Sequence, residues 1–251
     1  MKEPVFYLQG KSPVLPYVRA ALAERGYPPE EILSGKVTHV LLPVPSFPPE
    51  RPGGSGSDFL RCCSPDTVLL GGHFPEAFAP GYQKIDFLED PQYLAENAAI
   101  TAHCAVKLAL NRLDLTLADC RVLVLGWGRI GKCLALLLKN MGAQVTVAAR
   151  NPEARAVLRA LGYETLDTAG LSYALMRFHI LFNTVPAPIL SSTQLRHCRS
   201  FCLKIDLASV PGLDSPDAVQ ARGLPAKLAP ESSGRLIART ALRLAGREAP
   251  E

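Results

Sequence analysis

The sequence predicts an α/β fold of two domains: a small N-terminal parallel α/β domain and a C-terminal doubly wound domain. Short apolar runs alternate along the chain with stretches that can form helices, a pattern typical of parallel sheets. A glycine-rich turn follows one of these runs directly and is itself followed by a helical pattern. The length of 251 residues is sufficient for two such domains.

The first domain is expected to cover residues 1–95 and to be completed by the C-terminal helix. Ser12 is expected to cap a helix that has Pro13 at its first position and runs to about Arg25. The segment 43–57 is rich in proline and glycine and is expected to be a loop. The predicted strands are VFYLQ (5–9), VTHVLL (37–42), DTVLL (66–70) and QKIDF (83–87).

The second domain is expected to cover residues 96–251 and to begin with a linker helix over 97–112. A terminal helix is expected from Ser232 to about Gly246. The predicted strands are RVLVL (121–125), QVTVAA (144–149), HILFN (179–183), CLKID (202–206) and AKLA (226–229).

The turn Gly126-Trp127-Gly128-Arg129-Ile130-Gly131 has the G-x-G-x-x-G spacing of dinucleotide-binding sites. In such sites the first glycine allows the turn, the second lets the pyrophosphate approach, and the third lets helix and strand pack closely. Gly142 stands where a glycine often ends the following helix. The predicted buried face of that helix comprises Ile130, Cys133, Leu134, Leu137, Leu138 and Met141. The second domain is therefore expected to be of Rossmann type, with all six residues of the turn at the cofactor; the alternative is a turn that binds no ligand.

The residues at the end of the next strand indicate whether NAD(H) or NADP(H) is preferred. Ala149 occupies the position where NAD-binding sites usually carry Asp or Glu, and Arg150 and Asn151 follow it. A guanidinium at Arg150 can bind a 2′-phosphate, so the sequence predicts a preference for NADP(H) over NAD(H), with Arg150 and Asn151 at the site. The alternative is that Arg150 is only a solvated surface residue.

Composition excludes several classes of protein. A net charge of +4 without a Lys/Arg block argues against nucleic-acid binding. The seven cysteines lack zinc-ligand spacing, so we expect reduced thiols and no metal. No run of 18 apolar residues and no signal-peptide core occur in the sequence, so a cytoplasmic protein outside the membrane is expected.

Several stretches resemble, in order, the family of the A subunit of dipicolinate synthase. They are LLPVPS (41–46), the segment around Asn97 and Thr101, VLGWGRIG (124–131), ARNPEA (149–154), NTVP (183–186) with IDLASVPG (205–212), and GLPAKLAPESSG (223–234). The resemblance implies oxidation of dihydrodipicolinate, a small dicarboxylate, to dipicolinate during sporulation. It also implies a nicotinamide cofactor and, as partner, the flavoprotein-like second subunit of that synthase; self-association is left open.

The resemblance further implies site residues. Asn97 and Thr101 would face the substrate, and Ser209 would lie at the same site. The residues implied beside the nicotinamide are Asn183, Thr184, Val185, Pro186, Asp206 and Ala208.

Three further residues are assigned to the substrate by local reasoning. His103 is a candidate general base because it is the only histidine in the segment around Asn97. Two helix N-termini, one near Asn97 and one near Ser232 and Ser233, are hypothesised to bind one substrate carboxylate each. The alternative for His103 is a structural role, and the alternative for Asn97 and Ser232 is that they only cap their helices.

The chain departs from the family at Ile100, His103, Cys104, Glu231 and Ser232, where the family usually has Pro, Glu, Gly, Lys and Thr. The usual Gly-Gly-Asp turn near the N-terminus is also absent from LQGKSPVLP (8–16). These departures lie on the expected substrate side. Two alternatives therefore stand beside dipicolinate formation: another NADP-dependent oxidoreductase of a small 2-hydroxy or 2-keto acid, and a non-catalytic NADPH-binding partner subunit.

Overall fold

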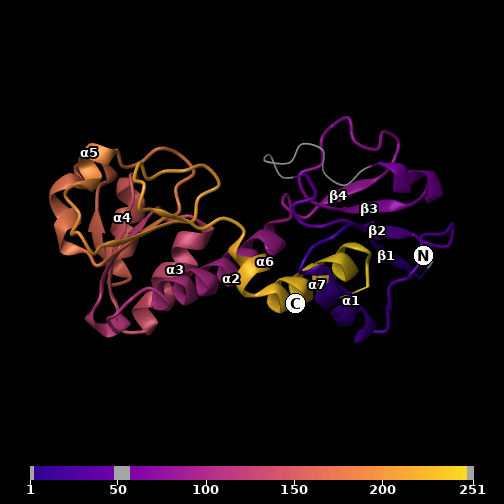
Figure 1. Cartoon of the computed structure of the whole chain (residues 1–251), viewed down its shortest axis with the longest axis horizontal. Helices are drawn as coiled ribbons and strands as arrows, with labels where there is room; N and C mark the ends of the chain where they lie inside the picture. The colour runs from indigo at the N-terminus through magenta and orange to yellow at the C-terminus, as the bar shows by residue number, and fades with distance from the viewer. Residues whose placement is uncertain (1–2, 48–56, 248–251) are drawn as a thin grey trace. The chain divides into compact units, whose positions relative to one another are not determined.

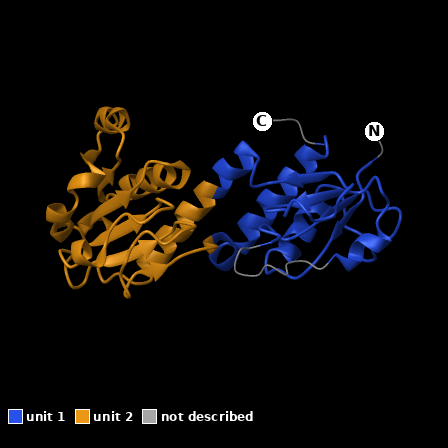
Figure 2. Ribbon diagram, turned by 90° about the horizontal axis from the view of Figure 1, so that it is seen from above, with its two compact units in different colours: residues 1–97, 225–251 blue, residues 98–224 orange. Residues whose placement is uncertain are grey.

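The computed structural model describes residues 3–47 and 57–247 of the chain. Two compact units are formed, one by residues 1–97 with 225–251 and the other by residues 98–224 (Figure 2). Each unit contains one sheet whose strands are all parallel (Figure 1). The predicted fold class is therefore confirmed.

The sheet of the first unit has the strand order β1-β2-β3-β4. All four predicted strands are present but shorter than predicted. Their bounds are β1 Phe6–Leu8, β2 His39–Leu41, β3 Val68–Gly71 and β4 Lys84–Asp86. The helical elements of this unit are α1 Leu15–Ala23, the 3-10 turn η1 Asp58–Cys62, and α7 Pro230–Leu244.

Helix α1 begins later than predicted, with Val14 and not Ser12 at its N-cap position. The Ser12 hydroxyl accepts a bond from the Val14 N–H at 3.3 Å, outside the helix. Pro16 lies in the first turn, where its missing N–H leaves no intrahelical bond unmade. The first turn therefore forms around Pro16 and not around Pro13.

The predicted loop 43–57 is described only at its two ends, because residues 48–56 lie outside the described residues. At its start, the buried Ser46 hydroxyl donates to the Pro43 carbonyl at 2.7 Å and accepts from the Gly72 N–H at 3.0 Å. These bonds join the beginning of the loop to the end of β3.

The sheet of the second unit has the strand order β10-β9-β8-β5-β6-β7. The chain passes outward from β5 to β7 and then returns to β8 on the other side of β5, which makes the domain doubly wound. The strands are β5 Arg121–Leu125, β6 Gln144–Ala148, β7 Glu164–Leu166, β8 Ile180–Asn183, β9 Leu203–Asp206 and β10 Val219–Gln220. The helical elements are α3 Arg129–Asn140, α4 Pro152–Ala160, α5 Ser192–Leu195 and the 3-10 turns η2 Leu117–Asp119, η3 Thr168–Gly170 and η4 Ser172–Arg177.

One predicted strand is wrong, and two short strands were missed. Residues 226–229 do not form a strand, because most of this segment belongs to helix α6, Leu224–Leu228. Its alanine, lysine and leucine side chains favour helix, and Pro225 fits the first turn. Strands β7 and β10 are too short to give a clear alternation of apolar and polar residues.

Helix α2, Pro91–Leu110, begins six residues before the predicted start at Asn97. Asp90 accepts a bond from the Tyr93 N–H at 2.7 Å, and Pro91 takes the first helical position. Arg243 of α7 pairs with the same Asp90 oxygen at 2.7 Å, and Arg239 pairs with Glu96. Asn97 therefore lies inside a helix and not at a helix N-terminus.

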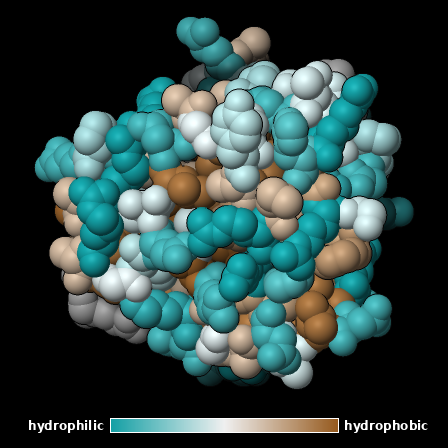
Figure 3. All heavy atoms as spheres, turned by 90° about the vertical axis from the view of Figure 1, so that its left-hand side faces the viewer, coloured by the Kyte–Doolittle hydropathy of each residue, from teal (hydrophilic) through white to brown (hydrophobic). Residues whose placement is uncertain are grey.

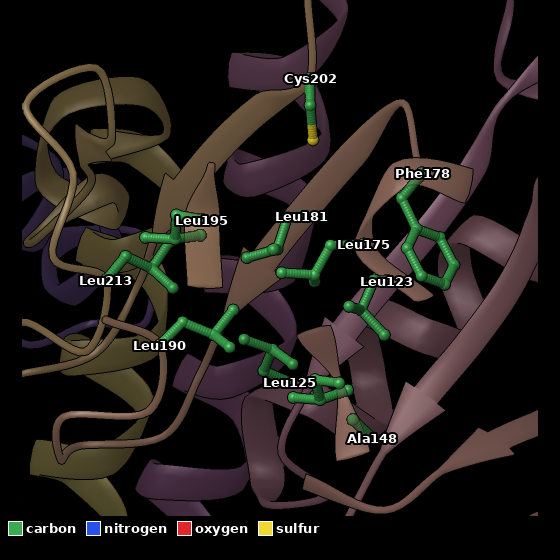
Figure 4. Packing of buried hydrophobic residues seen from close by; sticks show 11 residues of the cluster. Leu123, Leu125, Ala148, Leu175, Phe178, Leu181, Leu190, Leu195, Cys202 and Leu213 are labelled. Atoms are coloured by element: carbon green, nitrogen blue, oxygen red, sulfur yellow. The ribbon is translucent and has the colours of Figure 1, made fainter. Parts of the chain in front are cut away.

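One hydrophobic cluster of the second unit joins β5, β6 and β8 to the segment that connects β7 to β8 and to residues in and around α5. Figure 4 shows leucines of the strands packed against Leu175 and Phe178 of the connecting segment. The fully buried members include Leu123, Leu125, Leu181, Leu171 and Leu175. This packing fixes the ends of the central strands, where the glycine turn begins.

None of the described helices is long and apolar enough to cross a membrane. Hydrophilic residues cover most of the molecular face in Figure 3, and hydrophobic residues are seen mainly between them.

Helices α1 and α7 approach so closely that a side chain is excluded at Gly234. A Cβ atom on this residue would lie 2.6 Å from Tyr17 Cβ and 2.9 Å from the backbone of Tyr17 and Val18. Gly→Ala inside a helix normally stabilises by about 0.5–1 kcal/mol. We predict the opposite sign for Gly234→Ala, a loss of about 1–3 kcal/mol in the free energy of unfolding, because the helices must separate.

Urea unfolding followed by circular dichroism measures this loss. Gly35→Ala is the control, since a Cβ there meets nothing within 4 Å. A Gly234→Ala protein as stable as the parent would contradict the close packing of α1 on α7.

Candidate dinucleotide site

The glycine turn lies at the carboxyl end of β5, and its first glycine is required by the backbone. Gly126 has φ +98°, and its N–H donates to the Ala148 carbonyl of β6 at 2.9 Å. A Cβ there would also lie 2.6 Å from Thr184 Oγ1. The turn is thus held against both neighbours of β5.

The other two glycines have different reasons to lack a side chain. A Cβ on Gly131 would overlap the Gly126 carbonyl oxygen, so this residue is required for the turn to pack on α3. A Cβ on Gly128 would meet nothing within 4 Å, so nothing in the described structure requires glycine there.

The surroundings of Gly128 fit a dinucleotide. Gly128 is the N-cap of α3 and offers no side chain to the first N–H groups of the helix. Unpaired N–H groups at a helix N-terminus attract phosphate, and a glycine lets the phosphate approach the backbone. The turn also adjoins the point between β5 and β8 where the strand order reverses, the usual place for a ligand in such sheets.

Helix α3 buries a slightly different face from the predicted one. Leu134 and Leu138 are fully buried as predicted, but Met141 is 42% exposed. Gly131 and Ala135 are buried in its place, since the turn brings α3 closest to the sheet at its first residues. Gly142 has φ +87° and follows the C-cap residue, as predicted.

The segment after β6 presents a cation beside the turn. Ala149 is buried and donates to the Leu166 carbonyl at 3.1 Å, whereas Arg150 is exposed. Within residues 3–47 and 57–247, the Arg150 side chain makes no hydrogen bond or ion pair. Asn151 caps α4, because its side chain accepts from the Glu153 N–H at 2.8 Å.

Two fully buried polar side chains join the carboxyl ends of β8 and β9. Asn183 donates to Asp206 Oδ1 at 2.9 Å and to the Val185 carbonyl at 3.1 Å, and its own oxygen accepts from the Val185 N–H at 3.0 Å. The two Asp206 oxygens also accept three backbone N–H bonds. These come from Ala208 at 3.1 Å, Gly212 at 2.7 Å and Leu213 at 3.1 Å.

This network shapes the edge of the sheet beside the glycine turn. Thr184 donates its hydroxyl to the Leu125 carbonyl at 2.8 Å and thereby ties the end of β8 to the end of β5. A Cβ on Gly212 would clash with Asn183 and would lie 2.8 Å from the Ala187 carbonyl oxygen. Asn183 and Asp206 therefore act through the loops they hold.

Comparison with known proteins identifies the relationship. The chain is 31% identical over 156 residues to the A subunit of dipicolinate synthase from Bacillus subtilis strain 168. The match covers 59% of this chain and about half, 52%, of that protein. The chain is therefore similar to that A subunit over part of its length. No family model matches it.

Two solved structures of the A subunit of dipicolinate synthase share the fold. The Bacillus subtilis structure superposes with a TM-score of 0.81 at 22% identity, covering 98% of this chain and 97% of that chain. The Bacillus halodurans structure superposes with a TM-score of 0.77 at 21% identity, covering 96% and 97%.

The remaining residues that the dipicolinate synthase resemblance assigns to the cofactor lie near this edge. Val185 is half-buried, Pro186 is exposed and Ala208 is buried. Ser209, assigned to the substrate, is exposed directly after Ala208. Pro186 and Ser209 thus follow β8 and β9 at positions open to a ligand.

The three residues proposed on α2 do not share one face. Asn97 is half-buried and Thr101, one turn later, is buried. His103 is exposed and lies about 200° around the helix axis from Thr101. The helical geometry separates His103 from the other two, which sequence proximity alone did not reveal.

The hypothesis that two helix ends hold a dicarboxylate loses one of its two ends, because only the helix N-terminus near Ser232 and Ser233 is present. Asn97 lies in the interior of α2, and α7 begins at Pro230, two residues before the predicted start. Ser232 is exposed, and the buried Ser233 donates its hydroxyl to the Ala229 carbonyl at 3.1 Å. Asn97 therefore offers no helix N-terminus for the second carboxylate.

Trp127 makes a contact that the sequence does not predict. Its ring meets Tyr163 edge-on with centroids 5.9 Å apart, and burial raises the pKa of Tyr163. Lys132 lies over the Trp127 ring at 5.9 Å. No pattern in the sequence pairs a residue of the glycine turn with one that precedes β7.

A cavity of about 360 Å³ lies at the opposite edge of the same sheet. Its lining includes Arg121, Gln144 and Glu164, the first residues of β5, β6 and β7. It is therefore separate from the glycine turn, which lies at the carboxyl ends of the strands.

The Asp206 network generates a prediction about stability. In Asp206→Asn, one carboxylate oxygen becomes an NH₂ group, so at least one backbone N–H would face a donor. We predict a loss of about 2–4 kcal/mol in the free energy of unfolding, the cost of leaving buried hydrogen-bonding groups unpaired.

Chemical denaturation provides the measurement. Asp214→Asn is the control, because Asp214 is exposed and its side chain accepts, among the described residues, only from the Ser192 N–H at 3.1 Å. Equal stabilities of the Asp206 and Asp214 variants would argue against a carboxylate that organises this edge.

Proposed function

We propose that the chain is an NADP(H)-dependent oxidoreductase subunit that oxidises dihydrodipicolinate to dipicolinate, as implied by its resemblance to the A subunit of dipicolinate synthase. The observation that carries the proposal is the glycine turn with its open space at Gly128, at the reversal point of a doubly wound sheet. The similarity to dipicolinate synthase supplies the substrate class.

The residues of the turn would hold the cofactor. Gly126 and Gly131 shape the turn, and Gly128, Arg129 and Ile130 would place the first N–H groups of α3 against the pyrophosphate. Trp127, buttressed by Tyr163, would flank the cofactor. A bound nicotinamide would supply the hydride acceptor for the oxidation.

The loops after β8 and β9 would position the reacting groups. Asn183 and Asp206 hold these loops from within, while Thr184, Val185, Pro186 and Ala208 would line the nicotinamide side. Ser209 is exposed and would be able to reach the substrate. Because aromatisation of the dihydropyridine ring is strongly favourable, positioning is the main demand on the protein.

The cofactor preference would be set at the end of β6. A small buried residue, Ala149, replaces the usual acid, and the exposed Arg150 has no partner among the described residues. The Asn151 side chain caps α4, so Asn151 would contribute to cofactor binding through its backbone or through the loop that it fixes.

A second candidate function is a non-catalytic NADPH-binding subunit. It is favoured by the exposure of His103, which leaves α2 without a histidine beside Thr101, and by the departures from the family at Ile100, Cys104 and Glu231. Glu231 pairs with Arg235 at 2.9 Å and adds a carboxylate where the family usually has lysine. The flavoprotein-like partner would then supply the chemistry. Oxidation of another small carboxylate, of the 2-hydroxy or 2-keto acid type, is the remaining alternative.

NADPH is expected to bind more tightly than NADH, and Arg150→Ala is expected to narrow the difference. Loss of one charged contact to the 2′-phosphate should weaken NADPH binding by about ten- to a hundredfold and leave NADH binding unchanged. Calorimetric titration of both cofactors measures the effect.

The control is Arg196→Ala, which removes another exposed cation, at the end of α5. It should leave both affinities unchanged. Equal affinities for NADPH and NADH in the parent protein would contradict the proposed preference.

Turnover is predicted to require an intact glycine turn. With dihydrodipicolinate and NADP⁺, the chain should form NADPH, and Gly128→Val should abolish this activity because its side chain occupies the space for the pyrophosphate. Near-ultraviolet circular dichroism checks that the variant remains folded.

The assay is run with and without the flavoprotein-like partner of a dipicolinate synthase. Turnover of a small 2-hydroxy acid instead would favour the alternative oxidoreductase function. Tight NADPH binding without turnover of either substrate, with or without that partner, would favour the non-catalytic function.

A further inference from the structure

The guanidinium of a second arginine, Arg155, contacts the backbone that carries Arg150. Arg155, in the first turn and a half of α4, directs Nη1 back to the Ala149 carbonyl at 2.6 Å and to the Arg150 carbonyl at 2.9 Å. Side chains on a helix tilt toward its N-terminus, which explains how a residue of α4 reaches the segment before it. Arg155 therefore fixes the two consecutive peptide groups from which the Arg150 side chain projects.

The same guanidinium pairs with a carboxylate on the neighbouring strand. Arg155 Nη2 lies 2.8 Å from Asp167 Oδ2, and the other Asp167 oxygen accepts from the Ala169 N–H at 3.0 Å. Asp167 directly follows β7, whose last residue, Leu166, is in register with Ala148 at the end of β6. The carboxylate thus lies one strand away from the segment that carries Arg150, at the same edge of the sheet.

The exposure of the two partners is unequal. The Arg155 side chain is 17% exposed and the Asp167 side chain is 47% exposed. An acid at this edge would favour a ribose hydroxyl and repel a 2′-phosphate. Among the described residues, Arg155 is the only one that forms an ion pair with the Asp167 carboxylate and so offsets its charge.

We propose that the Arg155–Asp167 ion pair is a specificity-determining element of the dinucleotide site. Arg155 is a positioning residue: it orients the Arg150 segment and neutralises Asp167, so that the end of β6 accepts a 2′-phosphate. This inference rests on the proposed NADP(H) preference and extends it to two residues that do not themselves contact the phosphate.

The test measures the dissociation constant for NADH divided by that for NADPH, a ratio that is high when NADPH is preferred. Arg155→Gln should lower this ratio by about tenfold or more, because the Asp167 carboxylate is no longer neutralised. Adding Asp167→Asn to that variant should restore most of the ratio, since the repelling charge is then absent. A purely structural role for Arg155 would weaken both cofactors in parallel, and Asp167→Asn would restore nothing.

Asp167→Asn alone keeps the inference testable if Arg155→Gln does not fold. This variant leaves Arg155 unneutralised, so the ratio should rise above that of the parent. An unchanged or lower ratio would overturn the inference.

The matched control is Arg177→Gln, which breaks the ion pair of Arg177 with Glu164, 3.0 Å long, at the other edge of the sheet. It should leave the ratio unchanged. A parent protein with no preference for NADPH refutes both the proposed preference and this inference. A parent that prefers NADPH, with a ratio unaffected by Arg155→Gln, refutes only the inference.

Discussion

The carboxyl edge of the second sheet depends on one buried carboxylate. Asp206 ends β9, is fully buried, and accepts four hydrogen bonds, one from Asn183 and three from the backbone of the loop that follows. A carboxylate removed from water is costly unless its oxygens are fully bonded. Here each oxygen has two donors, so the loop that contains Ser209 can adopt only conformations that keep those N–H groups in place.

The first unit uses a similar device with a more accessible carboxylate. Asp86 ends β4 and accepts from the N–H groups of His73, Phe74 and Leu88, at 2.7, 3.4 and 2.7 Å. These bonds hold the loop after β3, in which His73 takes a φ of +59°, a conformation that residues other than glycine rarely adopt. In both units an aspartate at a strand end holds loop backbone. Asp86 holds the loop after the neighbouring strand β3, whereas Asp206 holds the loop that follows its own strand, β9.

The glycine turn shows how these constraints combine at a site. Gly126 is restricted by its own backbone and by Thr184, and Gly131 is restricted by the Gly126 carbonyl. Gly128 has no such restriction within the described structure. Two glycines therefore serve the fold, whereas the third leaves the N-terminus of α3 open. Two cations lie at the same edge of the sheet. Arg150 is exposed, and Arg155 donates to the carbonyls of Ala149 and Arg150.

The sequence alone was sufficient for the fold class, for most strands and for the turn over residues 126–131. These features depend on local rules: strands bury short apolar runs, and a glycine with positive φ marks a turn within a few residues. The exposed Arg150 after β6 was found in the same way, by its distance along the chain from the turn.

Only the tertiary structure decided how distant residues meet. Asn183 and Asp206 are 23 positions apart, and Arg155 of α4 meets Asp167 just beyond the end of β7, so no local pattern links either pair. It also placed His103 on the opposite side of α2 from Thr101 and put Asn97 inside that helix, because the helix start at Pro91 sets which residues share a face. The physical reason is that local propensity determines which element forms, whereas burial and long-range hydrogen bonds determine which side chains an element brings together.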